Sequence, residues 1–242
     1  MSRWEGDTEK LRYFRGGFYE CLDLRADALF ELTDAILIAS SVPSLPHLSL
    51  VPIHQRGWGS IYAALSKGRI DQDLLGELLD GHSPEDNATR GKPRVYAVDL
   101  TAWPRCDAES SPERGYYYHP SRYSAGQPIV AGWAYQLIAE IGFARDTWVA
   151  PVDVRRLRPV EDDNTVAQVR DLLGRLPHES PSPLFVFDAG YDPVKLQREL
   201  GETPLRLLVR LHSNRVFYAD PEQEGPRPVG RAKRYPALKK AA

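Results

Sequence analysis

The chain has 242 residues, of which 42% are apolar and 26% charged, an ordinary composition for a globular protein that could hold one or two domains. No apolar run approaches the roughly 20 residues of a membrane-spanning helix, and the N-terminus lacks the apolar stretch of a secretory signal. We therefore expect no membrane partner. Only two cysteines occur, Cys21 and Cys106, far apart and without metal-ligand spacing, which favours a reducing, cytoplasmic compartment.

The charges are unevenly distributed although the net charge is only −2. From Leu205 to the end, nine lysines and arginines stand against three acids, a local balance of +6. Such a segment could follow the phosphates of a nucleic acid, or it could be a solvated tail. The charge pattern by itself leaves both interpretations open.

Residues 1–82 show the periodicity of helices. Apolar residues recur at helical spacing over 25–40 and again over 74–79, where Asp71 stands in position to cap the second of these helices. Further helices are expected over 14–22 and 58–70. The polar segment 83–93, rich in Gly, Pro, Asp and Asn, follows as a linker between domains.

Beyond the linker the pattern changes to strands alternating with helices. Strands are expected over 94–100, 129–141, 147–154, 183–187 and 205–211, with a polar loop around the three tyrosines 116–118. Thr165 is expected to begin one helix in a T-x-x-Q capping box with Gln168, and Asp192 to cap another that ends at Gly201.

The predicted order is β-β-β-α-β-α-β, an antiparallel opening followed by units that favour parallel pairing. This is an α/β fold with the mixed sheet of the RNase H-like arrangement, without its final helix. The sequence therefore predicts an all-helical region at 1–82, an incomplete RNase H-like core at 94–220, and a basic tail containing Pro and Gly at 221–242.

Two aspartates stand where strands end. Asp99 lies near the end of the first predicted strand, and Asp188 follows Phe187 at the end of the fourth. Ligand-binding groups gather beyond the carboxyl ends of strands, so we expect these side chains to converge. Two adjacent carboxylates repel each other unless a cation lies between them, and Mg²⁺ or Mn²⁺ prefers such oxygen ligands. Metal ions held in this way can support phosphodiester cleavage. Alternatively, each aspartate only caps a loop.

Four segments resemble the DDE transposases of the IS4/IS701-like insertion-sequence group: VYAVDLTAWPR (95–105), residues 116–141, FVFDAGYDPVKL (185–196) and LVRLHSNRVFY (208–218). The resemblance implies that Asp99 is the first catalytic, metal-binding acid and that Asp188, in Asp-Ala-Gly-Tyr, is the second. The last segment resembles an arginine-rich element of the family, where Arg210 and Arg215 would meet DNA phosphates, the alternative being a solvated face.

The resemblance further implies a transposase that uses Mg²⁺ or Mn²⁺. Its partners would be the transposon ends and the target DNA, with assembly as a homo-oligomer possible. The ends would be hydrolysed, and the freed 3′-hydroxyl would then attack the target. The helical region 1–82 would grip DNA or help subunits to assemble.

The sequence departs from the family at the third acid, a glutamate carried by a helix after the fifth strand. Glu222 and Glu224 lie in a Pro/Gly-rich stretch without helical periodicity, so neither takes that role. We therefore expect a copy truncated before the third catalytic acid, and whether it cuts DNA stays open. The alternatives are a catalytically inactive DNA-binding remnant and, with less support, a stand-alone RNase H-like nuclease.

Overall fold

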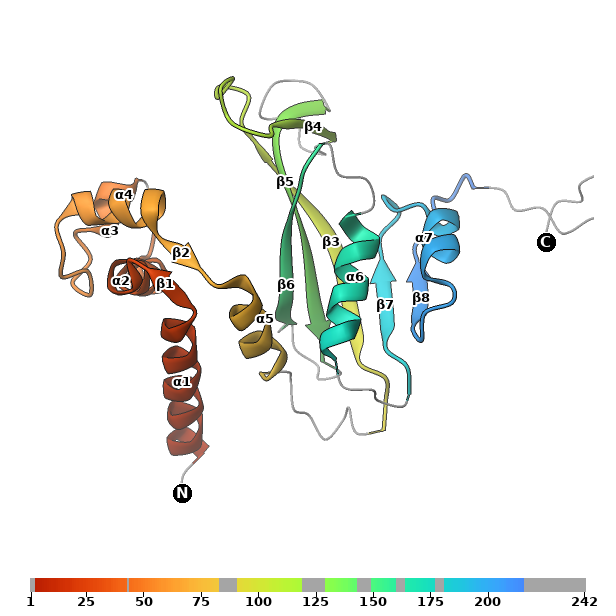
Figure 1. Cartoon of the computed structure of the whole chain (residues 1–242), viewed down its shortest axis with the longest axis horizontal. Coiled ribbons are helices and arrows are strands. Elements are labelled where there is room, and N and C mark those ends of the chain that lie inside the picture. The colour runs from red at the N-terminus through yellow and green to blue at the C-terminus, as the bar shows by residue number, and fades with distance from the viewer. Residues whose placement is uncertain are drawn as a thin grey trace, which may run out of the picture.

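The computed structural model describes residues 3–42, 44–82, 91–118, 129–142, 149–159, 164–176 and 181–215. Most of the predicted linker and all of the predicted basic tail lie outside these residues. The same holds for Glu222 and Glu224. In the part that is described, the N-terminal helices stand beside a mixed sheet that carries two helices (Figure 1). Among the described residues no helix has the length and apolarity to cross a membrane.

The N-terminal region contains the helices α1 (Arg3–Glu20), α2 (Ala26–Ile38), α3 (Leu45–Leu48), α4 (Trp58–Lys67) and α5 (Gln72–Asp80). The predicted cap of α5 is confirmed, because the Asp71 carboxylate accepts the backbone N–H groups of Asp73 and Leu74. The all-helical prediction needs one correction: β1 (Leu22–Leu24) and β2 (Arg69–Ile70) pair as a short antiparallel ribbon. The ribbon forms in the segments that connect the helices. It pairs backbone N–H and C=O groups that have no partner within a helix.

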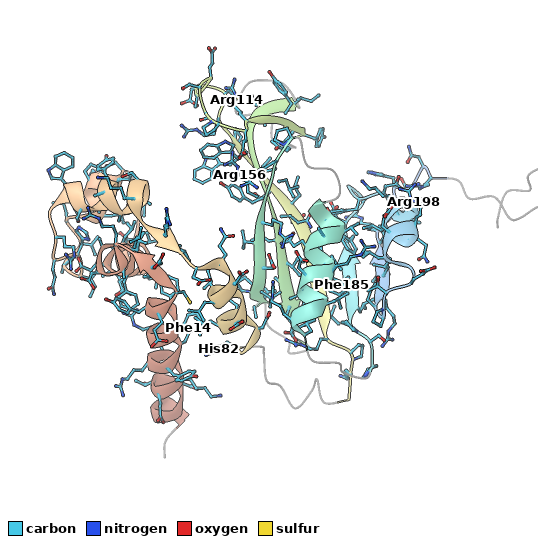
Figure 2. All side chains as sticks on the ribbon, viewed as in Figure 1. Phe14, His82, Arg114, Arg156, Phe185 and Arg198 are labelled. Carbon is cyan, nitrogen blue, oxygen red and sulfur yellow. The ribbon has the colours of Figure 1, made fainter. Side chains whose placement is uncertain are left out.

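The N-terminal helices form a small core of their own. Its fully or almost fully buried side chains come from α2, α3 and α4: Leu32, Ala35, Leu48 and Ile61. The ring of Phe14 on α1 meets the ring of His82, just after α5, edge to face with centroids 4.9 Å apart (Figure 2). The first and last helices of the region are therefore held together by an aromatic contact.

The sheet contains β3 (Val95–Pro104), β4 (Gly115–Tyr118), β5 (Ile129–Ile141), β6 (Val149–Leu157), β7 (Leu184–Phe187) and β8 (Arg206–Val209). Its order is β4-β5-β3-β7-β8, with β6 also paired to β5. β3, β4 and β6 pair with β5 antiparallel, whereas β7 pairs with β3 and β8 with β7 in parallel. The expected mixed sheet with antiparallel opening is thus confirmed.

The sequence predicts a polar loop around residues 116–118, where the structure has the strand β4. Gly115–Tyr118 instead pair with residues 129–132 at one end of β5, while β6 takes residues 134–141 of the same strand. The 13-residue β5 is long enough to offer its outer edge to both strands, and tyrosine is well suited to extended backbone. Residues 115–118 are therefore a strand because they pair with the edge of β5, not because apolar and polar residues alternate along them.

The helices α6 (Asn164–Arg175) and α7 (Pro193–Leu200) lie over one face of the sheet (Figure 1). Asp192 caps α7 as predicted, since its carboxylate accepts the Val194 N–H at 2.9 Å. Phe185 lies in the core between sheet and helices (Figure 2). The buried residues of this core come from both layers: Tyr96, Val98, Ile138, Val152, Val166, Val169, Leu172, Phe185, Phe187, Leu196 and Leu200.

The N-terminal region is attached to the sheet through α5. Arg175, at the end of α6, donates from Nε to Asp80 Oδ2 at 3.1 Å and from Nη2 to Asp153 Oδ2 at 2.8 Å. Burial raises the pKa of the Asp80 carboxyl, and the nearby Arg175 opposes that rise. One guanidinium therefore joins a helix of the N-terminal region, a helix of the core and a strand.

Replacing Leu172 by alanine tests the core. Its side chain is fully buried, so Leu172→Ala should lower the free energy of unfolding by about 2–5 kcal/mol. The matched control is Leu208→Ala on β8, which is 55% exposed and should cost less than about 1 kcal/mol. Urea denaturation followed by circular dichroism measures both. Equal losses would show that the core is not where the structure places it.

Candidate active site

The two predicted acids lie side by side on neighbouring strands. Asp188 directly follows β7 as predicted, whereas Asp99 lies within β3, because pairing with β5 extends that strand beyond the predicted end at residue 100 to Pro104. In the parallel pair of β3 and β7, Val98 is opposite Phe187, and Asp99 and Asp188 are the next residues of each chain segment. Neighbouring strands are about 4.8 Å apart. The two aspartates are 89 positions apart in sequence. Strand pairing thus brings the predicted pair together.

A third charged residue continues the same row. Phe187 of β7 is opposite Val209 of β8, and the Arg210 N–H donates to the Phe187 carbonyl at 2.9 Å. Arg210 is exposed, and within the described ranges its side chain has no hydrogen bond or ion pair. Asp99, Asp188 and Arg210 therefore each come directly after the last parallel residue pairs of three neighbouring strands, β3, β7 and β8.

Each carboxylate is held by one of its oxygens. Asp99 Oδ1 accepts the Leu100 N–H at 2.8 Å, and Asp188 Oδ1 accepts the Gly190 N–H at 2.9 Å. A Cβ atom at position 190 would lie 3.1 Å from Asp188 Oδ1, so glycine leaves room for that carboxylate. Both side chains are exposed, and their Oδ2 atoms have no partner among the described residues.

The other predicted DNA contact, Arg215, lies apart from this row. Its Nη2 atom is 3.7 Å from Asp192 Oδ1, the oxygen that caps α7. Both side chains are exposed, so solvent screens this ion pair strongly. Arg215 thus lies near the turn after β7 and remains accessible to a phosphate.

A half-buried tyrosine completes the turn after Asp188. The Tyr191 ring packs edge to face on Phe187, with centroids 5.1 Å apart, and its hydroxyl donates to Gln136 Oε1 at 3.4 Å. Burial raises the pKa of Tyr191, and the negative charges of Asp99 and Asp188 raise it further. The phenol therefore keeps its proton at neutral pH and cannot serve as a base.

Behind Tyr191 lies a buried polar pair that corrects the predicted capping box. Thr165 Oγ1 donates to Gln136 Oε1 at 2.7 Å, and Gln168 bonds to Gln136 and Asp153, so these side chains point to the strands rather than to the helix N-terminus. Gln136 and Gln168 are both fully buried. The sequence contains one sign of this buried polar pair: Gln136 is a polar residue at a core-facing position of the alternating run 129–141.

A cavity of about 290 Å³ opens beside Tyr191, on the side of α6 and α7. Tyr117 and Leu157 line it from the strands, Thr165 and Lys195 from the helices, and Arg158 and Tyr191 from the segments that follow β6 and β7. Elsewhere in the described ranges, no group of three or more acidic, histidine or cysteine side chains is arranged to hold a metal ion. Asp99 and Asp188 are therefore identified as a candidate metal site by the register of β3 and β7, and not by a larger cluster of metal-ligating side chains.

The repulsion between the acids is testable by itself. In EDTA, Asp99→Asn or Asp188→Asn should raise Tm by up to about 3 °C, because one of two like charges about 5 Å apart is removed. Asparagine keeps the oxygen that accepts the backbone N–H. As a control, Asp171→Asn loses an exposed ion pair with Arg155 and should leave Tm unchanged or slightly lower. A lower Tm for both site variants would contradict the proximity.

The model of the DDE superfamily endonuclease family matches residues 17–242. No curated protein matches the chain significantly. A piggyBac transposase, solved by cryo-EM as a synaptic complex with hairpin DNA, has a TM-score of 0.44 at 14% identity, over 80% of this chain and 43% of that chain.

The Drosophila P element transposase, in a strand transfer complex, has a TM-score of 0.40 at 18% identity, over 75% of this chain and 40% of that chain. The chain thus spans less than half the length of either transposase. The family model, by contrast, covers nearly the whole chain, and the protein belongs to the DDE superfamily endonuclease family.

Proposed function

We propose that the chain carries the acid pair of a transposase, and that Asp99 and Asp188 hold Mg²⁺ or Mn²⁺ for cleavage and strand transfer of DNA. The observation that carries the proposal is the β3–β7 register, which sets the two carboxylates next to each other. Their chemistry fits a hard divalent ion, because each offers an oxygen without a partner in the described part of the chain. Membership of the DDE superfamily endonuclease family supports the same reading.

When bound at such a carboxylate pair, divalent ions activate the attacking oxygen and neutralise the leaving oxygen of a phosphodiester. The residues of this chain would hold and orient the reactants. Asp99 and Asp188 would present their free oxygens where the parallel pairing of β3 and β7 stops, and Arg210 would offer a guanidinium beside them for a DNA phosphate. Arg215 would add a second, more distant phosphate contact.

The partners in this proposal are transposon ends and target DNA, in a cytoplasmic setting, with a homo-oligomer as the assembly. The N-terminal helices α1–α5 would bind DNA or a second subunit, which fits the exposed apolar side chains on α2 and α4, among them Leu37 and Leu65. Within the DDE superfamily, the four matching segments favour the IS4/IS701-like group.

The alternative is a chain that binds DNA without cutting it. Throughout the described ranges, no third acid, histidine or cysteine joins Asp99 and Asp188 to form a cluster. The resemblance calls for a third acid, a glutamate on a later helix, and two ligands alone position an ion poorly. Activity is therefore the property that separates the two proposals.

A nicking assay makes this separation. If the chain cuts, supercoiled plasmid should be nicked in Mn²⁺ and left intact in EDTA. Asp99→Asn and Asp188→Asn should each reduce nicking at least about 100-fold, because misplaced reactants lose rate on that scale. Asp171→Asn, on the exposed side of α6, should nick like the wild type.

Absence of nicking by a folded wild-type chain that still binds DNA would favour the inactive binder. Nicking that survives both site substitutions would rule out the acid pair as the metal site.

Measurements of DNA binding test the proposed phosphate contact of Arg210. Arg210→Ala should weaken binding to duplex DNA and reduce the slope of log K against log salt concentration by about one, the loss of one phosphate contact. Arg198→Ala is the matched control, since it removes an exposed arginine on α7 that pairs with its neighbour Glu199. Fluorescence anisotropy over a salt series measures both slopes. Equal slopes for the two variants would remove Arg210 from the interface.

A further inference from the structure

Two buried glutamines have their directions fixed by a carboxylate. Gln168 Nε2 donates to Asp153 Oδ1 at 2.8 Å, and Gln136 Nε2 donates to Gln168 Oε1 at 2.9 Å. An ionised carboxylate can only accept hydrogen bonds, so Gln168 must turn its amide nitrogen towards Asp153. Gln136 must in turn present its nitrogen to Gln168. The remaining oxygen, Gln136 Oε1, is thereby fixed as an acceptor.

Two hydroxyl groups use that acceptor. Thr165 Oγ1 donates to it at 2.7 Å and Tyr191 at 3.4 Å, which accounts for both lone pairs of the amide oxygen. Asp153 is anchored by Arg175, whose guanidinium also reaches Asp80 on α5. The position of the acceptor therefore depends on residues from two helices and two strands rather than on one flexible side chain.

The bond from Tyr191 to Gln136 crosses β3. Tyr191 follows β7 and Gln136 lies in β5, and the sheet order places β3 between these two strands. Gln136 is opposite Leu100, the residue directly after Asp99. A hydrogen bond between the turn after β7 and strand β5 must therefore pass over β3 next to Asp99.

We propose that Tyr191 is a positioning residue for Asp188: the Tyr191 hydroxyl fastens the turn 188–191 to Gln136 across β3. This inference rests on the proposed metal-binding function of Asp99 and Asp188. Among the described residues, the Gly190 N–H of the same turn is the one hydrogen-bond donor to the Asp188 side chain. Loss of the hydroxyl would let the turn move and widen the spacing between the two carboxylates.

A purely structural role for Tyr191 can be separated from a positioning role. The ring contributes packing on Phe187 and on the core, and phenylalanine at position 191 keeps that contact. Tyr191→Phe therefore removes only the hydroxyl. Tyr117→Phe is the matched control, because Tyr117 lines the same cavity and its hydroxyl donates to the Leu157 carbonyl at 3.1 Å, away from Asp188.

Calorimetric titration with Mn²⁺ measures the effect without relying on activity. Tyr191→Phe should bind Mn²⁺ about 10-fold more weakly than the wild type, the low end for groups that orient metal ligands. Tyr117→Phe should bind as the wild type does. Both variants should keep a wild-type Tm to within about 3 °C, which a packing defect would not allow.

A double-mutant cycle tests the route through Gln136. Gln136→Met removes the acceptor, so it should weaken Mn²⁺ binding in the wild-type background and have no further effect on binding in Tyr191→Phe. Full additivity of the two changes would overturn the route. If Gln136→Met does not fold, the comparison of Tyr191→Phe with Tyr117→Phe decides alone.

Asp188→Asn distinguishes failure of this inference from failure of the proposed function. If Asp188→Asn loses Mn²⁺ binding while Tyr191→Phe binds like the wild type, the positioning role is wrong and the metal site stands. If Asp188→Asn keeps wild-type affinity, the metal site itself is wrong, and the positioning role fails with it.

Discussion

The parallel pairing of β3 with β7 is the interaction on which the rest of the site depends. Four consecutive residue pairs, ending at Val98 and Phe187, set the register. A slip by one residue would turn one of the two acids to the other face of the sheet, because side chains alternate along a strand. Buried partners prevent that slip: Tyr96 stacks on Phe185 with ring centroids 5.1 Å apart, and both are fully buried. Packing in the core thus holds Asp99 and Asp188 in place.

The polar interior has a different task from the apolar one. Gln136 and Gln168 occupy fully buried positions where leucine would pack without needing partners, and buried amides stabilise a fold only when they are fully hydrogen-bonded. What they provide is direction: each amide can face only one way once Asp153 is ionised. The chain of bonds then specifies where a hydroxyl next to the acid pair can donate. Apolar packing is not directional in this sense.

The Arg175 guanidinium links the N-terminal helices to this interior. Arg175 contacts Asp80 on α5 and Asp153 on β6, and its side chain is 27% exposed. A cation that is largely removed from water requires both of these carboxylates. The attachment of α5 and the orientation of the buried glutamines therefore share one residue. In Figure 1, α5 lies against the β6 side of the sheet, while β7 and β8 lie on the other side of β3.

The sequence by itself determined most of the longer elements and their kinds, because periodicity and caps are local properties. It predicted the mixed sheet, the caps Asp71 and Asp192, the strand that contains Asp99 and the strand that ends before Asp188. Only the tertiary structure decided what depends on neighbours distant in the chain. The edge of β5 makes residues 115–118 a strand, and Gln136 draws Thr165 and Gln168 away from a capping box. A side chain that can bond locally or across the fold carries no local sign of which partner it will take.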